Sequence, residues 1–141
     1  MTPSCRAETV AASIEAFNAR GARAVLPFVA EDVEWHSAPG WAGKMLYRGH
    51  DGVLELIAEW TENFVDYKWV SVDVRELEDG RVLVLNRHKG RTRDGVLVDA
   101  PLASIWALRD DKVVGIWSYF TWKEARAAAG IGSPGVGSAA R

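Results

Sequence analysis

The feature that most constrains the fold is a change of hydrophobic period near Tyr67. Before that point apolar residues recur at helical spacing, whereas after it they alternate with polar residues, as in half-buried strands. The connectors EDGR, RDG and RDDK are short turn sequences, which make neighbouring strands antiparallel. The strands predicted in this half span residues 67–77, 81–92, 96–108 and 112–121.

The first half of the chain supplies helices that can cover such a sheet. Val10, Ile14 and Phe17 form the apolar stripe of a helix that Gly21 ends, and a short second helix is predicted over 22–30. A strand over 33–37 follows, and Pro39 and Gly40 end it. Residues 40–49 are assigned to a loop, and a last helix is predicted over 122–130.

The third helix is predicted over residues 50–64. Its apolar stripe consists of Val53, Leu56, Ile57, Trp60 and Phe64, while Glu55, Glu59 and Glu62 are predicted to face water.

Helices followed by an antiparallel sheet predict an α+β fold. A strongly curved sheet wraps its concave face around the helices, and a ligand cavity can form between them. At 141 residues the chain has the length of one domain. We expect this domain to span residues 1–131, and the Gly/Ser-rich tail over 132–141 to be disordered.

Composition argues against several classes of partner. A net charge of −2 gives no electrostatic reason to expect nucleic acid or an anionic membrane as a partner. The longest apolar run, over 24–30, is far shorter than a membrane span. The N-terminus lacks an apolar signal-peptide region, and Cys5 is the single cysteine, so we expect a cytoplasmic protein. No nucleotide-binding fingerprint is present, and no cofactor is predicted.

Alternation along the strands assigns side chains to the cavity. In 33–37, Trp35 and Ser37 share the inward, apolar face, and His36 lies on the opposite one. In 81–92, three cations on one face, Arg87, Lys89 and Arg91, cannot be buried unpaired. Asn86 and His88 are therefore predicted to point inward.

The position of His88 depends on the turn at 93–95. A three-residue turn with Gly95 at positive φ would set His88 opposite Ala100, whereas a two-residue turn would expel His88 from the cavity. On the next strand the inward set would be Ala100, Leu102, Ser104 and Trp106. Asp99 would then lie on the opposite face, so no dyad with His88 is expected.

Several separated motifs carry a family resemblance. EAFNARGARAVLPFVAEDVEWHSAPG, YRGHDGVLELIAEW, HKGRTRDG, IWALRDDKVVGIWSYF and KEARAAAG resemble the SnoaL-like branch of the nuclear transport factor 2-like (ketosteroid isomerase-like) superfamily. The resemblance covers about residues 8–131. It implies a cone-shaped fold in which a curved antiparallel sheet wraps around three N-terminal-half helices, with a short C-terminal helix. Because fold does not imply function, the site is argued separately.

The same resemblance places the last strand and suggests an assembly. It puts Ile116, Ser118 and Phe120 inward and Trp117 and Tyr119 on the outer sheet face. A large aromatic patch on an outer face usually marks an interface. Because such families commonly form homodimers, a homodimer is predicted here.

The charged residues used by known families of this fold are missing at the matching positions. Where ketosteroid isomerases carry their base and oxyanion donors, this chain has Ser37, Ser13 and Ser104. At the epoxide-hydrolase positions it has Trp35, Ser37, Asn86, His88 and Ser118. Near the acid–base aspartate of polyketide cyclases it has Ser118 and Thr121. A serine without an adjacent base cannot abstract a carbon-bound proton at neutral pH.

His88 is then the one titratable group predicted inside an otherwise apolar hollow. It is the candidate catalytic acid–base, although a hydrogen-bonded structural role is the alternative. No metal site is predicted, because His36, His50 and His88 lie on different faces or elements. The predicted ligand-binding residues are Trp35, Ser37, Trp60, Phe64, Asn86, Leu102, Trp106, Ser118 and Phe120.

Three functions fit this prediction. The first is a lyase, isomerase or polyketide cyclase-like enzyme acting on a hydrophobic cyclic compound. The second is a non-catalytic binder of a hydrophobic small molecule. The third is a dimeric assembly module whose cavity is filled by side chains.

Overall fold

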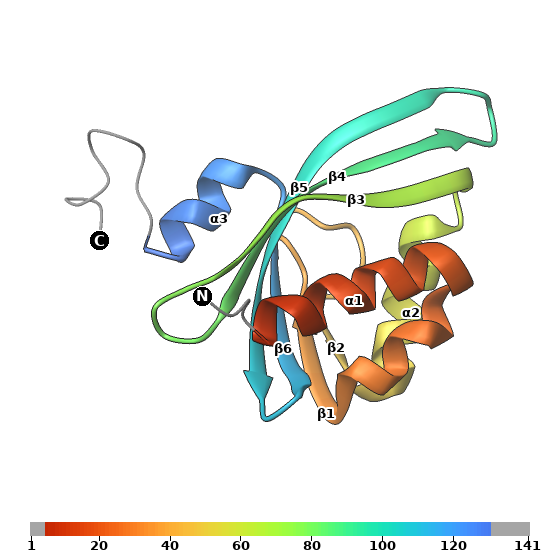
Figure 1. Cartoon of the computed structure of the whole chain (residues 1–141). Helices are drawn as coiled ribbons and strands as arrows, with labels where there is room; N and C mark the ends of the chain where they lie inside the picture. The colour runs from red at the N-terminus through yellow and green to blue at the C-terminus, as the bar shows by residue number, and fades with distance from the viewer. Residues whose placement is uncertain (1–4, 131–141) are drawn as a thin grey trace.

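Helices cover both faces of one sheet in the computed structural model, which describes residues 5–130. Helices α1 and α2 lie together on one face, and α3 lies on the other (Figure 1). The helical elements are α1 (Cys5–Arg20), a 3-10 helix η1 (Ala22–Phe28), α2 (Gly49–Thr61) and α3 (Trp122–Ala128). The strands are β1 (Val29–His36), β2 (Leu46–Arg48), β3 (Phe64–Glu76), β4 (Val82–Thr92), β5 (Leu97–Arg109) and β6 (Lys112–Tyr119).

The sheet has six strands in the order β2-β1-β6-β5-β4-β3. The predicted antiparallel meander from β3 to β6 is confirmed, and so is the α+β class. Several features differ from the prediction. β1 begins at Val29, inside the helix predicted over 22–30, and β3 begins at Phe64, inside the helix predicted over 50–64. β1 pairs parallel with β6, and β2 pairs with β1 inside the segment assigned to a loop. A strand of three residues is too short to show a period of two, which is why the sequence did not predict it.

β4 is buried on both faces, and this splits the core in two. Val82 and Val84 pack into the large cluster with α1, α2 and the tryptophans. Leu83 and Leu85 pack into a smaller cluster with Ala125 of α3. A strand covered on both sides carries a continuous apolar run, which is the VLVL that opens β4.

The hairpin between β4 and β5 has the predicted three-residue turn. The Thr92 and Gly95 amides donate to the Val96 and Thr92 carbonyl oxygens, both at 2.9 Å, and Gly95 has φ 89°. The register pairs His88 with Ala100. On the outer face Arg87 meets Asp99 at 2.6 Å. The inward direction of His88 is therefore confirmed.

The outer sheet face is covered at one end only. Tyr119 packs beneath α3, whereas Trp117 stacks on His36 with ring centroids 5.0 Å apart and remains 36% exposed. The homodimer across this face stays a prediction. The predicted tail over 132–141 lies outside the described residues, and no helix within residues 5–130 is long and apolar enough to cross a bilayer.

Gly52 sets how closely α2 approaches β2, and its replacement tests this packing. A Cβ at Gly52 would lie 2.9 Å from the backbone carbonyl carbon of Tyr47. Although Gly→Ala ordinarily stabilises a helix, overpacking costs about 1–3 kcal/mol. We expect Gly52→Ala to lower the free energy of unfolding, measured by urea denaturation. Ala58→Ser, on the exposed side of α2, should change it by roughly 0.5 kcal/mol or less. A Gly52→Ala protein as stable as the wild type would contradict the packing described.

Candidate functional site

A cavity of about 380 Å³ opens between α2, the end of β1 and the β4–β5 hairpin. This volume suits a small organic ligand, for which pockets of about 300–1,000 Å³ are usual. Most of its lining is aromatic or aliphatic. The lining residues are Trp35, Ser37, Ala38, Trp41, Leu56, Glu59, Trp60, Asn63, Phe64, His88, Val98, Ala100, Pro101, Leu102, Ser118 and Phe120.

Most of the predicted ligand-binding residues lie on this wall. They are Trp35, Ser37, Trp60, Phe64, Leu102, Ser118 and Phe120, and the candidate His88 joins them. Phe64 reaches the cavity from the first position of β3 and not from the third helix, because α2 ends at Thr61.

Asn86 and Trp106 do not line the cavity, contrary to the prediction. In the amide orientation that satisfies both neighbours, Asn86 accepts from Trp69 Nε1 at 2.7 Å and donates to the Leu102 carbonyl at 3.0 Å. Trp106 is 1% exposed and donates to Ser104 Oγ at 2.6 Å. Both residues face inward, but they are fully buried against the core and do not reach the cavity.

The serines on the cavity wall already have protein partners. Trp35 Nε1 donates to Ser118 Oγ at 3.0 Å, which holds the indole across the base of the cavity. The Ser37 hydroxyl donates to the Lys44 carbonyl oxygen at 2.7 Å, which ties the end of β1 to the loop before β2. A hydroxyl that accepts a hydrogen bond can still donate one, so Ser118 keeps a proton for a ligand.

His88 is held by two aromatic neighbours. Trp60 Nε1 donates to His88 Nδ1 at 2.9 Å, and the Tyr67 hydroxyl contacts the same nitrogen. The side chain is 8% exposed, and this burial lowers the pKa of His88 from 6.5 to about 3. The imidazole is therefore neutral at physiological pH.

These contacts fix the tautomer of His88. An indole N–H can only donate, so Nδ1 accepts and the proton of the neutral ring is on Nε2. No hydrogen bond from residues 5–130 reaches Nε2. In that part of the chain every side-chain nitrogen or oxygen that is shut off from solvent has a hydrogen-bond partner, so Nε2, which has none, is not shut off. Nε2 is thus open to the cavity that His88 lines, and it presents a donor there.

The burial of His88 makes a prediction about acid stability. The unfolded chain takes up this proton near pH 6.5, whereas the folded chain takes it up only near pH 3. The stabilisation is fully present above pH 6.5 and is lost as the pH falls toward 3, by about 1.4 kcal/mol per pH unit. Between roughly pH 6 and pH 5, the slope of unfolding free energy against pH should be smaller in His88→Gln by about 1 kcal/mol per unit. Equal slopes in urea titrations of the two proteins would contradict a buried, neutral His88.

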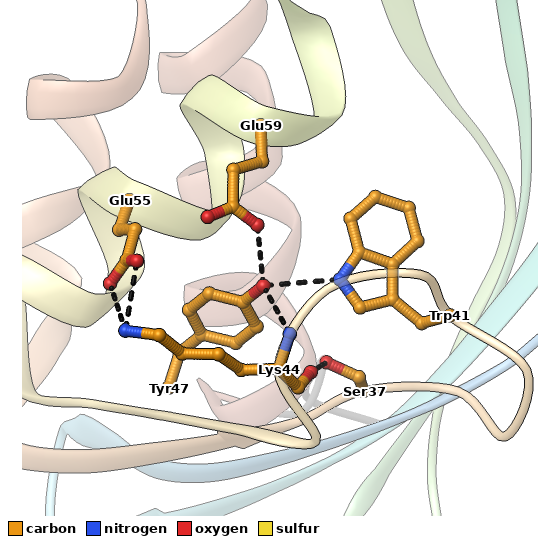
Figure 2. Close-up of polar contacts among 6 residues, drawn as sticks. All are labelled: Ser37, Trp41, Lys44, Tyr47, Glu55 and Glu59. Atoms are coloured by element: carbon orange, nitrogen blue, oxygen red, sulfur yellow. Dashed lines mark hydrogen bonds and ion pairs between the residues drawn. The ribbon is translucent and has the colours of Figure 1, made fainter.

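Glu59 is the main correction to the predicted site. It was expected to face water, and the hollow was expected to hold no ionisable group but His88. The structure instead places Glu59 on the cavity wall. Figure 2 shows the carboxylate pointing from α2 toward the Tyr47 hydroxyl, on which the Trp41 indole also converges.

The Tyr47 hydroxyl holds the Glu59 carboxylate in place. It donates to Glu59 Oε1 at 2.5 Å and accepts from Trp41 Nε1 at 3.1 Å and from the Lys44 amide at 3.0 Å. The Lys44 ammonium is occupied elsewhere, because it pairs with Glu55 at 2.9 Å, a contact that raises the pKa of Lys44. The same pairing is visible in Figure 2.

Removing the Tyr47 hydroxyl should destabilise this wall. Tyr47 is 1% exposed, so Tyr47→Phe leaves the Trp41 indole N–H and the Lys44 amide without their acceptor. Because Trp41 is half-buried and Lys44 is exposed, water can satisfy these groups in part, and we expect a loss of about 1 kcal/mol in unfolding free energy. Tyr119→Phe is the matched control, because burial and the charge of Arg81 act on the Tyr119 hydroxyl but no hydrogen bond from a described residue does. Equal losses in the two variants would contradict the role given to Tyr47.

Glu59 and Asn63 could have been found from the sequence, but Trp41 could not. Glu59 and Asn63 follow Leu56 at i+3 and i+7, so they border the inward stripe of the helix predicted over 50–64, although α2 itself ends before Asn63. Trp41 lies in an irregular loop that has no period. Within residues 5–130, no group of three or more His, Cys, Asp or Glu side chains is placed to hold a metal ion.

Comparisons with solved structures show a shared fold. TerC co-crystallized with polyporic acid is 23% identical, with a TM-score of 0.73, and the match covers 84% of this chain and 92% of TerC. A nuclear transport factor 2-like protein of unknown function from Burkholderia pseudomallei is 23% identical, with a TM-score of 0.74 and coverages of 88% and 96%. A protein of the same fold from Anabaena variabilis is 21% identical, with a TM-score of 0.71 and coverages of 86% and 94%.

The sequence itself matches a known domain family. No curated protein matches the chain. The SnoaL-like domain, however, matches residues 10–116, which run from α1 to β6 and include the cavity wall up to β5. The chain therefore belongs to the SnoaL-like domain family.

Proposed function

We propose that this protein binds a flat or cyclic hydrophobic small molecule and that His88 Nε2–H donates a hydrogen bond to an oxygen of that ligand. The observation that carries the proposal is the hydrogen bond from Trp60 Nε1 to His88 Nδ1, because it turns a neutral N–H toward the cavity. A buried N–H without a partner is costly, so a ligand oxygen that accepts from it gains affinity and orientation.

The lining of the cavity supports a hydrophobic ligand. Trp35, Trp41, Trp60, Phe64 and Phe120 surround it, and large rings supply much apolar contact area with few rotatable bonds. The unfilled volume beside Trp35 counts against a mere assembly module, whose side chains would occupy it.

An isomerase, lyase or cyclase-like activity is a second candidate, with a changed role for His88. With Nδ1 occupied and the proton on Nε2, the neutral ring has no lone pair free to take a proton from a substrate. It can instead donate to a carbonyl oxygen and stabilise the negative charge that develops there. A protein that binds the ligand without converting it would use the same hydrogen bond from His88 Nε2–H, so this geometry fits both functions.

A matched pair of ligands tests the donor. 1-Tetralone and tetralin share a ring system, and only 1-tetralone carries a carbonyl. We expect the wild type to bind 1-tetralone about three- to tenfold more tightly by calorimetry, as one net hydrogen bond allows. His88→Met should lose this preference, and His88→Gln, which keeps an acceptor and a donor, should retain part of it. His36→Met, on the other sheet face, should behave as the wild type.

The site itself is tested by filling it. Ala100 lines the cavity opposite His88 in the hairpin, so Ala100→Phe should abolish binding of both ligands. Binding that survives in Ala100→Phe would place the ligand elsewhere. Equal affinity of the wild type for the two ligands would contradict the role of His88.

A further inference from the structure

We infer that the ligand carries a cationic, alkylated amine that binds against the Glu59 carboxylate. The inference rests on the proposed function, because it concerns the same cavity, and it adds the charge and chemical class of the ligand. It arises from the carboxylate that α2 contributes, which the alternation of the strands did not predict.

The cavity carries one kind of charge. Among the described residues that line it, Glu59 is the only acidic or basic side chain, since His88 is neutral. No ion pair to Glu59 occurs within residues 5–130, and the nearby Lys44 is paired with Glu55. The Lys44 charge acts on Glu59 only at longer range, and no cation of the described residues pairs with this half-buried carboxylate directly. Such a carboxylate attracts a cationic ligand and repels an anionic one.

The two oxygens of the Glu59 carboxylate differ in their hydrogen bonds, and one of them is free to contact a ligand. Oε1 accepts the Tyr47 hydroxyl at 2.5 Å, whereas no hydrogen bond from the described residues reaches Oε2. Figure 2 shows this second oxygen apart from the Tyr47 contact. The Tyr47 hydroxyl is itself fixed, because it accepts hydrogen bonds from the Trp41 indole and the Lys44 amide. The Glu59 carboxylate is therefore held in place before a ligand binds.

Aromatic rings stand next to this charge. Trp60 and Trp41 line the same cavity as Glu59, and the Trp41 indole donates its N–H to the Tyr47 hydroxyl that donates to Glu59. Aromatic faces attract cations, and a carboxylate among tryptophans is a setting in which a methylated ammonium group is recognised. A primary ammonium group has three N–H donors to satisfy, whereas Glu59 offers one free oxygen, so the geometry fits a tertiary or quaternary amine better.

Two isosteric probes isolate the charge. 3-Hydroxyphenyltrimethylammonium and 3-tert-butylphenol have the same shape and the same hydroxyl, and only the first is a cation. We expect the wild type to bind the cation about tenfold more tightly or better by calorimetry. Glu59→Gln, which can still accept from Tyr47, should bring the two affinities to within about threefold by weakening the cation alone. Glu62→Gln, one residue past the end of α2 and exposed, should keep the wild-type ratio.

The outcomes separate this inference from the proposed function. Saturable binding of both probes with equal affinity would overturn the amine inference and leave the pocket for a neutral ligand. A cation preference that survives in Glu59→Gln would overturn the role of Glu59. Binding of neither probe, nor of 1-tetralone, would overturn both proposals. Loss of the preference in Glu59→Gln but not in Glu62→Gln supports the inference.

Discussion

The register of the β4–β5 hairpin controls which side chains meet the cavity, and charge enforces that register. A slip of one residue would turn Arg87 and Lys89 inward and His88 outward. Burying two cations without partners would cost several kcal/mol each, roughly the whole stability of a small domain. In the observed register both cations lie near Asp99 on the outer face. The outer face therefore keeps the cavity wall in place.

The two side chains Glu59 and His88, which give the cavity its ionisable groups, are each oriented by a hydrogen bond to a neighbouring aromatic residue. His88 is oriented by Trp60 and Glu59 by Tyr47, and neither orienting bond would be consumed by a ligand. In surroundings of low polarity such hydrogen bonds are strong. A ligand whose polar atoms do not meet the oriented His88 and Glu59 groups leaves them unpaired and loses affinity. This favours a ligand of limited size with few polar atoms at fixed positions.

Much of this arrangement followed from the sequence, and its limits have physical causes. The period of two predicted the faces of β1 and β4, and with them Trp35 and His88, whereas the inward face of β6, with Ser118, followed from the family resemblance. Alternation assigns a face but not a depth along the strand, which is why Asn86 and Trp106 were wrongly placed in the cavity. Glu59 was missed because it lies at the edge of the apolar stripe of α2. A polar residue at that edge can face either water or the cavity, and its polarity does not tell which.

The crowding of indoles beneath the cavity has an optical consequence. Ring centroids of Trp35, Trp60, Trp69 and Trp106 lie 5.2 to 6.4 Å from their neighbours. Aromatic rings held in one asymmetric packing produce a near-ultraviolet dichroism that vanishes when side chains become mobile, even if helices and strands persist. The folded molecule thus carries its own spectroscopic signature of ordered tertiary packing, centred on the floor of the cavity.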